Sequence, residues 1–355
     1  MTARAAVWDG AGFQVARFPL PEPGPGEALV RVRMATICGS DLHTLRGARP
    51  APVPIVLGHE AVGHVVAAGP GIRTCSGAPV VEGMRLTWTI GTSCGECRPC
   101  VRGLSQKCAH RRKYGHERSV PEWRLSGGFA DHCHLLAGTG SVEVPPEVPD
   151  AVITPANCAT ATVVNAVRRA APGADDVVVV QGCGMLGLTA LAYLRHLGVR
   201  AIAASDPHPA RRRAALRFGA AVATAPERLD AEVRELSGGE GAAAVLELSG
   251  SGAAAAASLD LLGTGGHLVL VGSVLPVAEL DVAPEAVVRR LLTISGVHNY
   301  GLDDLAEAVR FLATGVRHED FAALVPSAFP LDSVAAAVSA ADRGEAPRVA
   351  IAPGW

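Results

Sequence analysis

Residues 177–187 read VVVVQGCGMLG, an apolar run that leads into three glycines spaced Gly-x-Gly-x-x-Gly. This pattern is typical of the strand, tight turn and helix that begin a dinucleotide-binding fold, where backbone amides at the helix start face a pyrophosphate. In a chain with 40 glycines the motif alone is weak evidence. The sequence around it therefore decides its interpretation.

The chain on both sides of this turn alternates between strand and helix patterns. We predict strands at 176–181, 201–205, 243–248, 267–271 and 292–295, with helices at 162–171, 185–197, 209–218 and 252–262. Nearly continuous apolar strands separated by helices indicate a parallel sheet covered on both faces. The sequence therefore predicts a Rossmann-type, doubly wound domain.

Asp206 stands at the end of the second of these strands, 24 residues beyond Gly182. A carboxylate at this point accepts hydrogen bonds from ribose hydroxyls and repels a 2′-phosphate, which favours NAD over NADP. Arg211 could instead contact such a phosphate, although an arginine in the first turn of a helix is more often solvated.

Four cysteines fall within fifteen residues, on turns that contain glycine and proline: Cys94, Cys97, Cys100 and Cys108. Four thiolates can surround one tetrahedral zinc ion, and that number of ligands closes a structural site. We therefore predict a structural zinc here rather than a disulfide framework.

A second possible zinc site combines Cys38, His59 and Cys158. Two thiolates and one imidazole leave a coordination position free for an alcohol or aldehyde oxygen. Taken singly, each residue also has an ordinary interpretation as a buried side chain, and the spacing of Cys158 is the weakest of the three.

Two acidic residues accompany this second group. We expect Asp41 to accept the other ring N–H of His59 and so fix its tautomer, with a solvated loop carboxylate as the alternative. Glu60, which follows His59 directly, is either a group beside the metal, an occasional extra ligand or one half of a structural ion pair.

The bulk composition excludes several classes of partner. With 355 residues, two domains are expected. The 32 basic and 34 acidic residues give a net charge of -2, which offers no basic field for nucleic acid or anionic lipid. We expect neither a membrane-spanning stretch nor a signal peptide. Nine cysteines with metal-type spacing lead us to expect a reducing, cytoplasmic compartment.

These residues resemble the zinc-dependent medium-chain alcohol dehydrogenase family over essentially the whole chain. The segment 58–72 fits the zinc signature of that family, and 127–131 (GGFAD) is similar to its Gly-Gly-Phe-Ala-Glu turn. The resemblance implies a GroES-like, mostly β catalytic domain formed by 1–158 and 296–355, with a structural zinc lobe at about 91–112. It implies a NAD-binding Rossmann domain at 159–295.

The resemblance also implies roles for individual residues. Cys38, His59 and Cys158 would hold a catalytic zinc, while Ser40 and His43 would carry the proton away from the alcohol. The nicotinamide ring would lie against Thr162. The expected cofactor contacts are Gly182, Gly184, Met185, Leu186, Gly187, Asp206, Arg211, Ser249, Val271, Ser273 and, at the pyrophosphate, Arg348.

We therefore expect two zinc ions per chain and reversible hydride transfer between NAD and an alcohol, aldehyde or ketone, in a homodimer or homotetramer. The segment 157–163 (NCATATV) is similar to a bacterial branch linked with phosphonate metabolism, which leaves an anionic aldehyde or alcohol as an alternative. Candidate anion-binding residues are Arg46, Arg111, Arg112 and Lys113.

Two further alternatives stay open. A zinc-free reductase of the same fold would lack the cysteines and His59, and a nucleic-acid-binding zinc module would need a basic field that the balanced charge does not supply. Segments 45–53, 114–123 and 297–300 are the expected walls of the substrate pocket.

Overall fold

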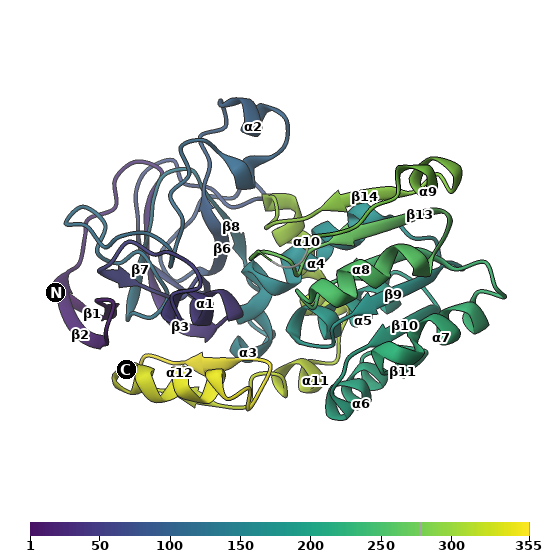
Figure 1. Ribbon diagram of the computed structural model, residues 1–355. Helices are drawn as coiled ribbons and strands as arrows, with labels where there is room; N and C mark the ends of the chain where they lie inside the picture. The colour runs from purple at the N-terminus through teal and green to yellow at the C-terminus, as the bar shows by residue number, and fades with distance from the viewer. Residues whose placement is uncertain (277–278, 355) are drawn as a thin grey trace. The chain divides into compact units, whose positions relative to one another are not determined.

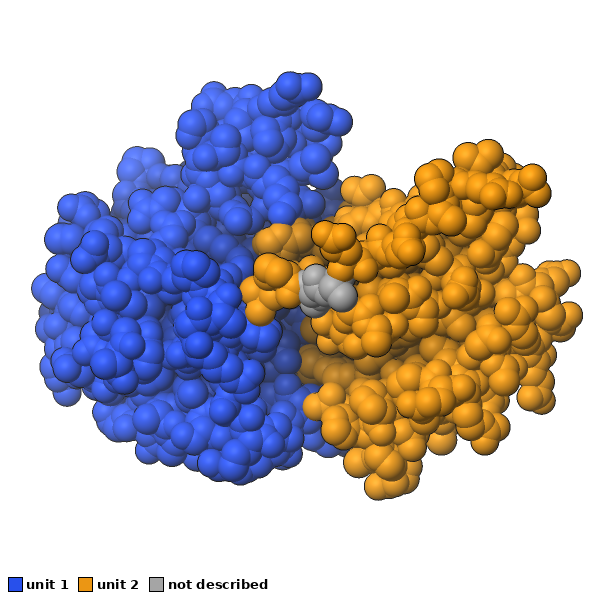
Figure 2. Space-filling view, viewed as in Figure 1, with its two compact units in different colours: residues 1–161, 301–355 blue, residues 162–300 orange. Residues whose placement is uncertain are grey.

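The structure is a computed structural model that describes residues 1–276 and 279–354 (Figure 1). The chain divides into two compact units, one formed by residues 1–161 and 301–355 and the other by residues 162–300 (Figure 2). The boundaries expected from the sequence lie at 158/159 and 295/296 instead.

Unit 162–300 contains a parallel six-stranded sheet in the order β11-β10-β9-β12-β13-β14. Its helices pack as two pairs, α5 with α6 and α7 with α8, as the prediction of a covered parallel sheet requires. The strands are β9 (Val177–Gln181), β10 (Ala201–Ser205), β11 (Val222–Thr224), β12 (Ala242–Glu247), β13 (Leu262–Leu270) and β14 (Thr293–Gly296). The helices are α5 (Met185–His196), α6 (Pro209–Arg217), η3 (Pro226–Arg228), α7 (Leu229–Leu236), α8 (Gly252–Leu261) and α9 (Pro284–Arg289).

The glycine turn between β9 and α5 has the backbone that its sequence demands. Gly182 has φ +90°, and a Cβ atom there would lie 2.8 Å from Ser249. A Cβ on Gly187 would lie 1.8 Å from the carbonyl oxygen of Gly182. Glycine is therefore required at both positions, because any side chain would displace the turn from the strand ends.

Unit 1–161 and 301–355 is mostly antiparallel β structure. One sheet has the order β2-β1-β4, and a larger one runs β15-β16-β3-β5-β6-β8 with β7 paired to β3. The strands are β1 (Thr2–Trp8), β2 (Phe13–Pro19), β3 (Ala28–Ile37), β4 (Ile55–Val56), β5 (Glu60–Ala68), β6 (Arg85–Thr92), β7 (His132–Leu135), β8 (Thr139–Glu143), β15 (Ala328–Phe329) and β16 (Val349–Ile351). The helices are α1 (Gly39–Leu45), α2 (Arg98–Val101), η1 (Ser105–Lys107), α3 (Asp150–Ile153), η2 (Thr154–Asn157), α10 (Leu302–Thr314), α11 (His318–Ala322), η4 (Leu331–Ser333) and α12 (Val334–Asp342). Helix α4 (Ala159–Ala170) contains the boundary between the units.

The pairing of β3 with β5 brings together the chain segments that carry Cys38 and His59. Thr36 of β3 lies opposite Glu60 of β5, so the residues just after β3 and just before β5 meet at one edge of the sheet. The C-terminal strand β16 pairs with the other side of β3, with Ala350 opposite Thr36. Three segments far apart in the sequence therefore meet at the point where β3 ends.

Among the elements of the second unit, β11, α7 and α9 are absent from the sequence prediction. In α7 only Leu229 and Val233 are buried, and the polar residues between them hide the helical period. Across the described residues, no helix is long and apolar enough to cross a membrane.

Candidate active site

Four potential metal ligands converge where β3 ends and β5 begins. The ligand atoms of Cys38, His59, Glu60 and Cys158 all lie within 4.8 Å of one another. Cys38 caps α1, His59 precedes β5, and Cys158 follows the short helix η2. The structure thus brings together the three residues that the sequence analysis selected for the catalytic zinc, and all four belong to unit 1–161 and 301–355.

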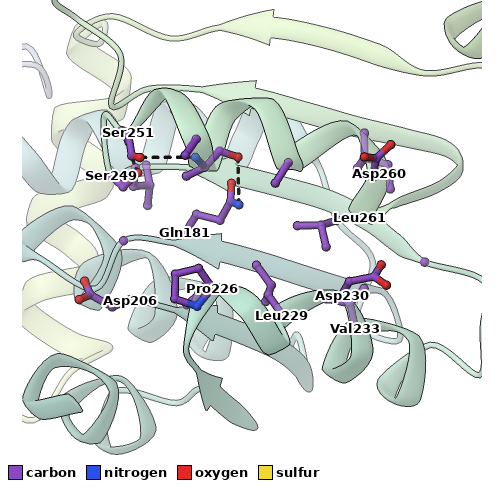
Figure 3. A pocket seen from close by; sticks show the side chains of 18 of the residues that line it. Gln181, Asp206, Pro226, Leu229, Asp230, Val233, Ser249, Ser251, Asp260 and Leu261 are labelled. Carbon is purple, nitrogen blue, oxygen red and sulfur yellow. Dashed lines mark hydrogen bonds between the residues drawn. The ribbon is translucent and has the colours of Figure 1, made fainter. Parts of the chain in front are cut away.

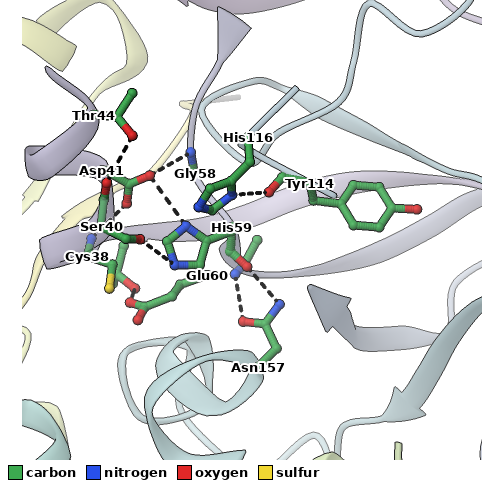
Figure 4. Close-up of polar contacts among 12 residues, drawn as sticks. Cys38, Ser40, Asp41, Thr44, Gly58, His59, Glu60, Tyr114, His116 and Asn157 are labelled. Carbon is green, nitrogen blue, oxygen red and sulfur yellow. Dashed lines mark hydrogen bonds and ion pairs between the residues drawn. The ribbon is translucent and has the colours of Figure 1, made fainter. Parts of the chain in front are cut away.

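The carboxylate of Asp41 orients this cluster. Its Oδ2 accepts a hydrogen bond from the Cys38 backbone N–H at 2.9 Å, and its Oδ1 lies 3.4 Å from His59 Nδ1, with both side chains buried (Figure 4). The other ring nitrogen, Nε2, lies 3.3 Å from the hydroxyl oxygen of Ser40. With Asp41 at Nδ1, Nε2 is the nitrogen available to a metal, which is the arrangement expected for a metal-bound histidine.

The electrostatics of the cluster suit a cation. Burial opposes protonation of His59, but Asp41 and Cys38 outweigh it and raise the pKa of the imidazole to about 10. A hydrogen bond with Cys158, acting against burial, lowers the pKa of Cys38 well below its ordinary value, and Arg348 and His59 lower it further. A thiolate, a second thiol and an imidazole form a donor set that zinc accepts, so the residues present fit that ion.

Glu60 is held by a buried ion pair. Its carboxylate accepts hydrogen bonds from Arg348 Nε at 2.7 Å, from Arg348 Nη2 at 2.8 Å and from the Thr36 hydroxyl at 2.5 Å. Arg348 Nη2 also lies 3.5 Å from the Cys38 sulfur, and its Nη1 donates to the carbonyl oxygen of Pro347. In the structure the Arg348 side chain contacts Glu60 and Cys38, beside the proposed metal ligands. Its expected contact with a pyrophosphate stays a prediction.

Asn157 ties the strands of this site together, a role that the sequence analysis did not identify. Its Nδ2 donates to the carbonyl oxygen of His59 at 3.0 Å (Figure 4). The same Nδ2 donates to the carbonyl oxygen of Trp88 at 2.9 Å, and Oδ1 accepts from the Ala61 N–H at 3.3 Å. One buried amide therefore fixes the backbone of His59 next to Cys158. Only its position directly before a candidate ligand could have drawn attention to it.

His116 is a second side chain that sequence reasoning did not single out. Its ring lies 4.8 Å, centroid to centroid, from that of His59, and its Nδ1 bonds to the carbonyl oxygen of Tyr114 at 2.8 Å. Burial and the positive charges of His59 and Lys113 lower the pKa of His116 well below its ordinary value. The sequence placed it only inside the expected wall segment 114–123.

Cys94, Cys97, Cys100 and Cys108 form the second metal-type cluster, around α2 and η1. Their sulfur atoms lie within 4.8 Å of one another, and the Cys97 sulfur is 3.4 Å from that of Cys100. The backbone N–H of Ala109 points at the Cys97 sulfur at 3.5 Å, and such backbone contacts lower the pKa of Cys97 to about 6. Four sulfurs gathered in this way fit a tetrahedral zinc.

Unit 162–300 contains a cavity of about 1060 Å³ beside the glycine turn (Figure 3). Among the expected cofactor residues, those that line it are Gly182, Gly184, Asp206, Arg211 and Ser249. Those that do not line it are Met185, Leu186, Gly187, Val271, Ser273 and Arg348. Thr162 lies in α4 and is buried.

The carboxylate of Asp206 faces this cavity and also holds its backbone. Its Oδ2 accepts from the Cys183 N–H at 2.9 Å and its Oδ1 from the His208 N–H at 2.8 Å, while Arg211 Nη1 lies 3.8 Å away. Glu247 plays a similar part for Ser249, which also lines the cavity: its Oε1 accepts from the backbone N–H and the hydroxyl of Ser249. Acidic side chains thus fix the loops at the carboxyl ends of β9, β10 and β12, where ligands bind in open α/β sheets.

Comparison with known proteins agrees with this architecture. The family described as alcohol dehydrogenase GroES-like domain matches residues 24–146, and the family described as zinc-binding dehydrogenase matches residues 186–314. The chain is 30% identical over 351 residues to 5-exo-hydroxycamphor dehydrogenase from Pseudomonas putida, covering 96% of each chain. It is 32% identical over 298 residues to an L-threonine 3-dehydrogenase from Deinococcus deserti, covering 81% of each.

The fold is shared with a crystal structure of an alcohol dehydrogenase from Thermotoga maritima. The two superpose with a TM-score of 0.93 at 27% identity, and the match covers 100% of both chains. The predicted GroES-like domain and Rossmann-type domain are therefore confirmed. This protein belongs to the zinc-dependent medium-chain alcohol dehydrogenase family.

Proposed function

We propose that this family member is an NAD-dependent alcohol dehydrogenase whose catalytic zinc is held by Cys38, His59 and Cys158. The observation that carries the proposal is the convergence of these ligand atoms, with that of Glu60, within 4.8 Å. The reaction is reversible hydride transfer between NAD and a small alcohol, aldehyde or ketone. Nothing found favours a nucleic-acid-binding module or a zinc-free reductase.

The donor set defines what the metal contributes. Zinc bound by two sulfurs and one nitrogen supplies Lewis-acid chemistry, which lowers the pKa of an alcohol hydroxyl. Asp41 keeps the His59 ring in position through Nδ1, and Arg348 holds Glu60 beside the ligands. Cys94, Cys97, Cys100 and Cys108 would hold a second, structural zinc.

Ser40 and His43 are the proposed route for the alcohol proton. The Ser40 hydroxyl lies 3.3 Å from His59 Nε2, the nitrogen that faces the proposed zinc position, so it can accept a proton from an alcohol bound there. Ser40 and His43 are three residues apart in α1 and therefore share one face of that helix. His43 is only partly buried and can pass the proton on towards water.

NAD is the proposed hydride acceptor. Its adenosine half would occupy the 1060 Å³ cavity, with the diphosphate at the turn of Gly182 and Gly184 and a ribose at Asp206. Both oxygens of Asp206 accept backbone N–H groups, yet each keeps a further lone pair for a ribose hydroxyl. By the family resemblance, the residues proposed to line the rest of the cofactor are Thr162, Met185, Leu186, Gly187, Val271, Ser273 and Arg348.

The remaining expectations belong to the same proposal. The protein acts in the cytoplasm, as a homodimer or a homotetramer, on a small-molecule substrate. The similarity of segment 157–163 to a branch linked with phosphonate metabolism stays a hypothesis about that substrate.

The proposal is tested by alcohol-dependent formation of NADH. The purified protein is mixed with NAD and a panel of primary and secondary alcohols, and absorbance of the reduced cofactor is followed before and after treatment with a strong zinc chelator. We expect turnover that the chelator abolishes and that zinc restores. Turnover that survives complete removal of zinc would contradict the assignment of Cys38, His59 and Cys158.

A further inference from the structure

A lysine without an acidic partner lies close to the catalytic cluster. Lys113 is 8% exposed, and among residues 1–276 and 279–354 its ammonium group makes no hydrogen bond or ion pair. The Cys38 and Cys158 thiols are both among the groups that act on it electrostatically. A buried cation so close to the reacting centre lacks the carboxylate that such a group ordinarily needs.

The backbone holds this lysine firmly against the site. Lys113 pairs with Gly91 at the end of β6, and the next residue, Tyr114, donates its N–H to the carbonyl oxygen of Ile90. Two residues further on, the His116 ring packs on that of His59. The segment 113–116 is therefore fixed beside the proposed zinc ligands through both its backbone and its side chains.

Further cations surround Lys113. The positive charges of Arg49 and Arg111 act on Lys113, and Arg49 also acts on Arg111 and His116. One carboxylate, Glu117, acts on Arg111. That carboxylate is already engaged, because it accepts from Arg112 Nε at 2.5 Å and from the Lys113 backbone N–H.

Among the groups named, Lys113 therefore has cations close by and no carboxylate of its own. Burial, and then Arg49 and Arg111, lower the pKa of Lys113 to about 7, against the opposing effect of Cys158 and Cys38. The protonated lysine is therefore less favoured in the free enzyme than an ordinary lysine would be, and an anion beside it would favour that form. A bound anion would supply the partner that the chain does not provide.

The other candidate cations have partners of their own. Arg46 pairs with Asp342 on the surface, and Arg112 pairs with Glu117 while its guanidinium lies 4.7 Å from the centre of the Trp123 ring. Neither needs a ligand to balance its charge. The sequence alone made Arg46, Arg112 and Lys113 equal candidates for anion binding. The structure shows that Arg46 and Arg112 already have acidic partners.

We propose that Lys113, with Arg49 and Arg111, binds an anionic group of the substrate, so that this enzyme acts on alcohols or aldehydes that also carry a carboxylate or phosphonate. This inference rests on the proposed function, since it names the substrate class for the same site. Lys113 and the arginines bind and orient the substrate, and the chemical step stays with the zinc ligands, Ser40 and His43.

The test compares matched alcohols that differ in one charge. A series of ω-hydroxy carboxylates of increasing chain length is assayed against the corresponding uncharged ω-hydroxy amides, and a hydroxyalkylphosphonate arm separates the two anion types. The measured quantity is the ratio of kcat/KM for acid over amide. Calorimetric titration of the same compounds into the zinc-loaded enzyme without NAD gives a second ratio, from binding alone.

We expect a ratio of about tenfold or more for the wild type, because a hydrogen bond to a buried charge is stronger than one between neutral groups. Lys113→Met should lower it by about tenfold, and Lys113→Arg should restore most of it. Arg49→Gln should also lower the acid-over-amide ratio. Because the Arg49 side chain is partly exposed, this variant provides the test if Lys113→Met does not fold. Arg46→Gln is the matched control and should keep the wild-type ratio.

Two outcomes would overturn the inference. One is a wild-type ratio near one in both turnover and binding. The second outcome is that the acid-over-amide ratio stays unchanged in both Lys113→Met and Arg49→Gln. A change in these variants that is confined to the KM for NAD counts as this outcome too. If no alcohol of any charge is oxidised, the proposed function fails instead, and the binding ratio still decides whether the anion site exists.

Discussion

Replacing Asn157 by alanine should weaken the catalytic zinc site without touching any ligand. The contacts of this amide include three buried hydrogen bonds, with the carbonyl oxygens of His59 and Trp88 and with the N–H of Ala61. Each such bond contributes about 1 kcal/mol, so the substitution removes about 3 kcal/mol of interactions. Their loss releases the His59 backbone from the segment that ends at Cys158.

This energy can be converted into an expected change of zinc affinity. If most of it serves to hold the ligands in place, affinity falls by about 100-fold, since 1.4 kcal/mol corresponds to a factor of ten. Loss of a group that orients metal ligands elsewhere lowers affinity by 10–100-fold, roughly the same range. The four-cysteine site shares no hydrogen bond with Asn157 in the contacts described above and should keep its zinc.

The assay is competition with a coloured zinc chelator, which resolves the two zinc ions of each chain by the chelator concentration that removes them. Asn165→Ala is the matched control, because Asn165 is also a buried asparagine and donates to the carbonyl oxygen of Asn299 within unit 162–300. We expect one zinc to become about 10–100 times easier to remove in Asn157→Ala and neither zinc to change in Asn165→Ala. Equal zinc retention in the two variants would refute the role given to Asn157.

Three further predictions follow from the same structure. Cys97→Ser should reduce zinc content from two ions to one and lower the melting temperature, whereas Cys75→Ser, at an exposed thiol outside both clusters, should do neither; full zinc content in Cys97→Ser would count against a structural metal. Asp206→Ser should reduce the preference for NAD over NADP by about tenfold in kcat/KM, because the carboxylate that faces a 2′-phosphate is gone, and an unchanged preference would remove Asp206 from that role. The acid-over-amide ratio should fall as pH rises through about 7, because Lys113 then loses its charge, and should stay flat in Lys113→Arg; a wild-type ratio that rises with pH would contradict a cationic Lys113.

The sequence was most informative where function depends on neighbours along the chain. The strand and glycine turn at 177–187 and the four cysteines at 94–108 are local patterns, and the structure shows both as compact local features. In unit 162–300 the predicted strand boundaries agree within a residue or two except at β13, which begins at Leu262 rather than at His267. There the segment GTGG at 263–266 lacks apolar side chains, so no strand pattern was visible.

Contacts between distant segments escaped the sequence analysis. Asn157 bonds to residues about 70 and 100 positions away, and nothing around it indicates those partners. Lys113 pairs with Gly91 and is acted on by the charge of Arg49, and both partners come from segments well before it in the chain. The contact of Arg348 with Glu60 likewise depends on the return of β16 to β3, which no local pattern indicates, and its contact with a pyrophosphate stays a prediction.

The central claim is that zinc held by Cys38, His59 and Cys158 supports hydride transfer to NAD. Its most direct test measures zinc content and alcohol-dependent NADH formation on the same preparations of the wild type and Cys38→Ala. We predict two zinc ions and turnover in the wild type, and one zinc ion with no turnover in Cys38→Ala. A Cys38→Ala protein that kept both its second zinc and near-normal turnover would contradict the account.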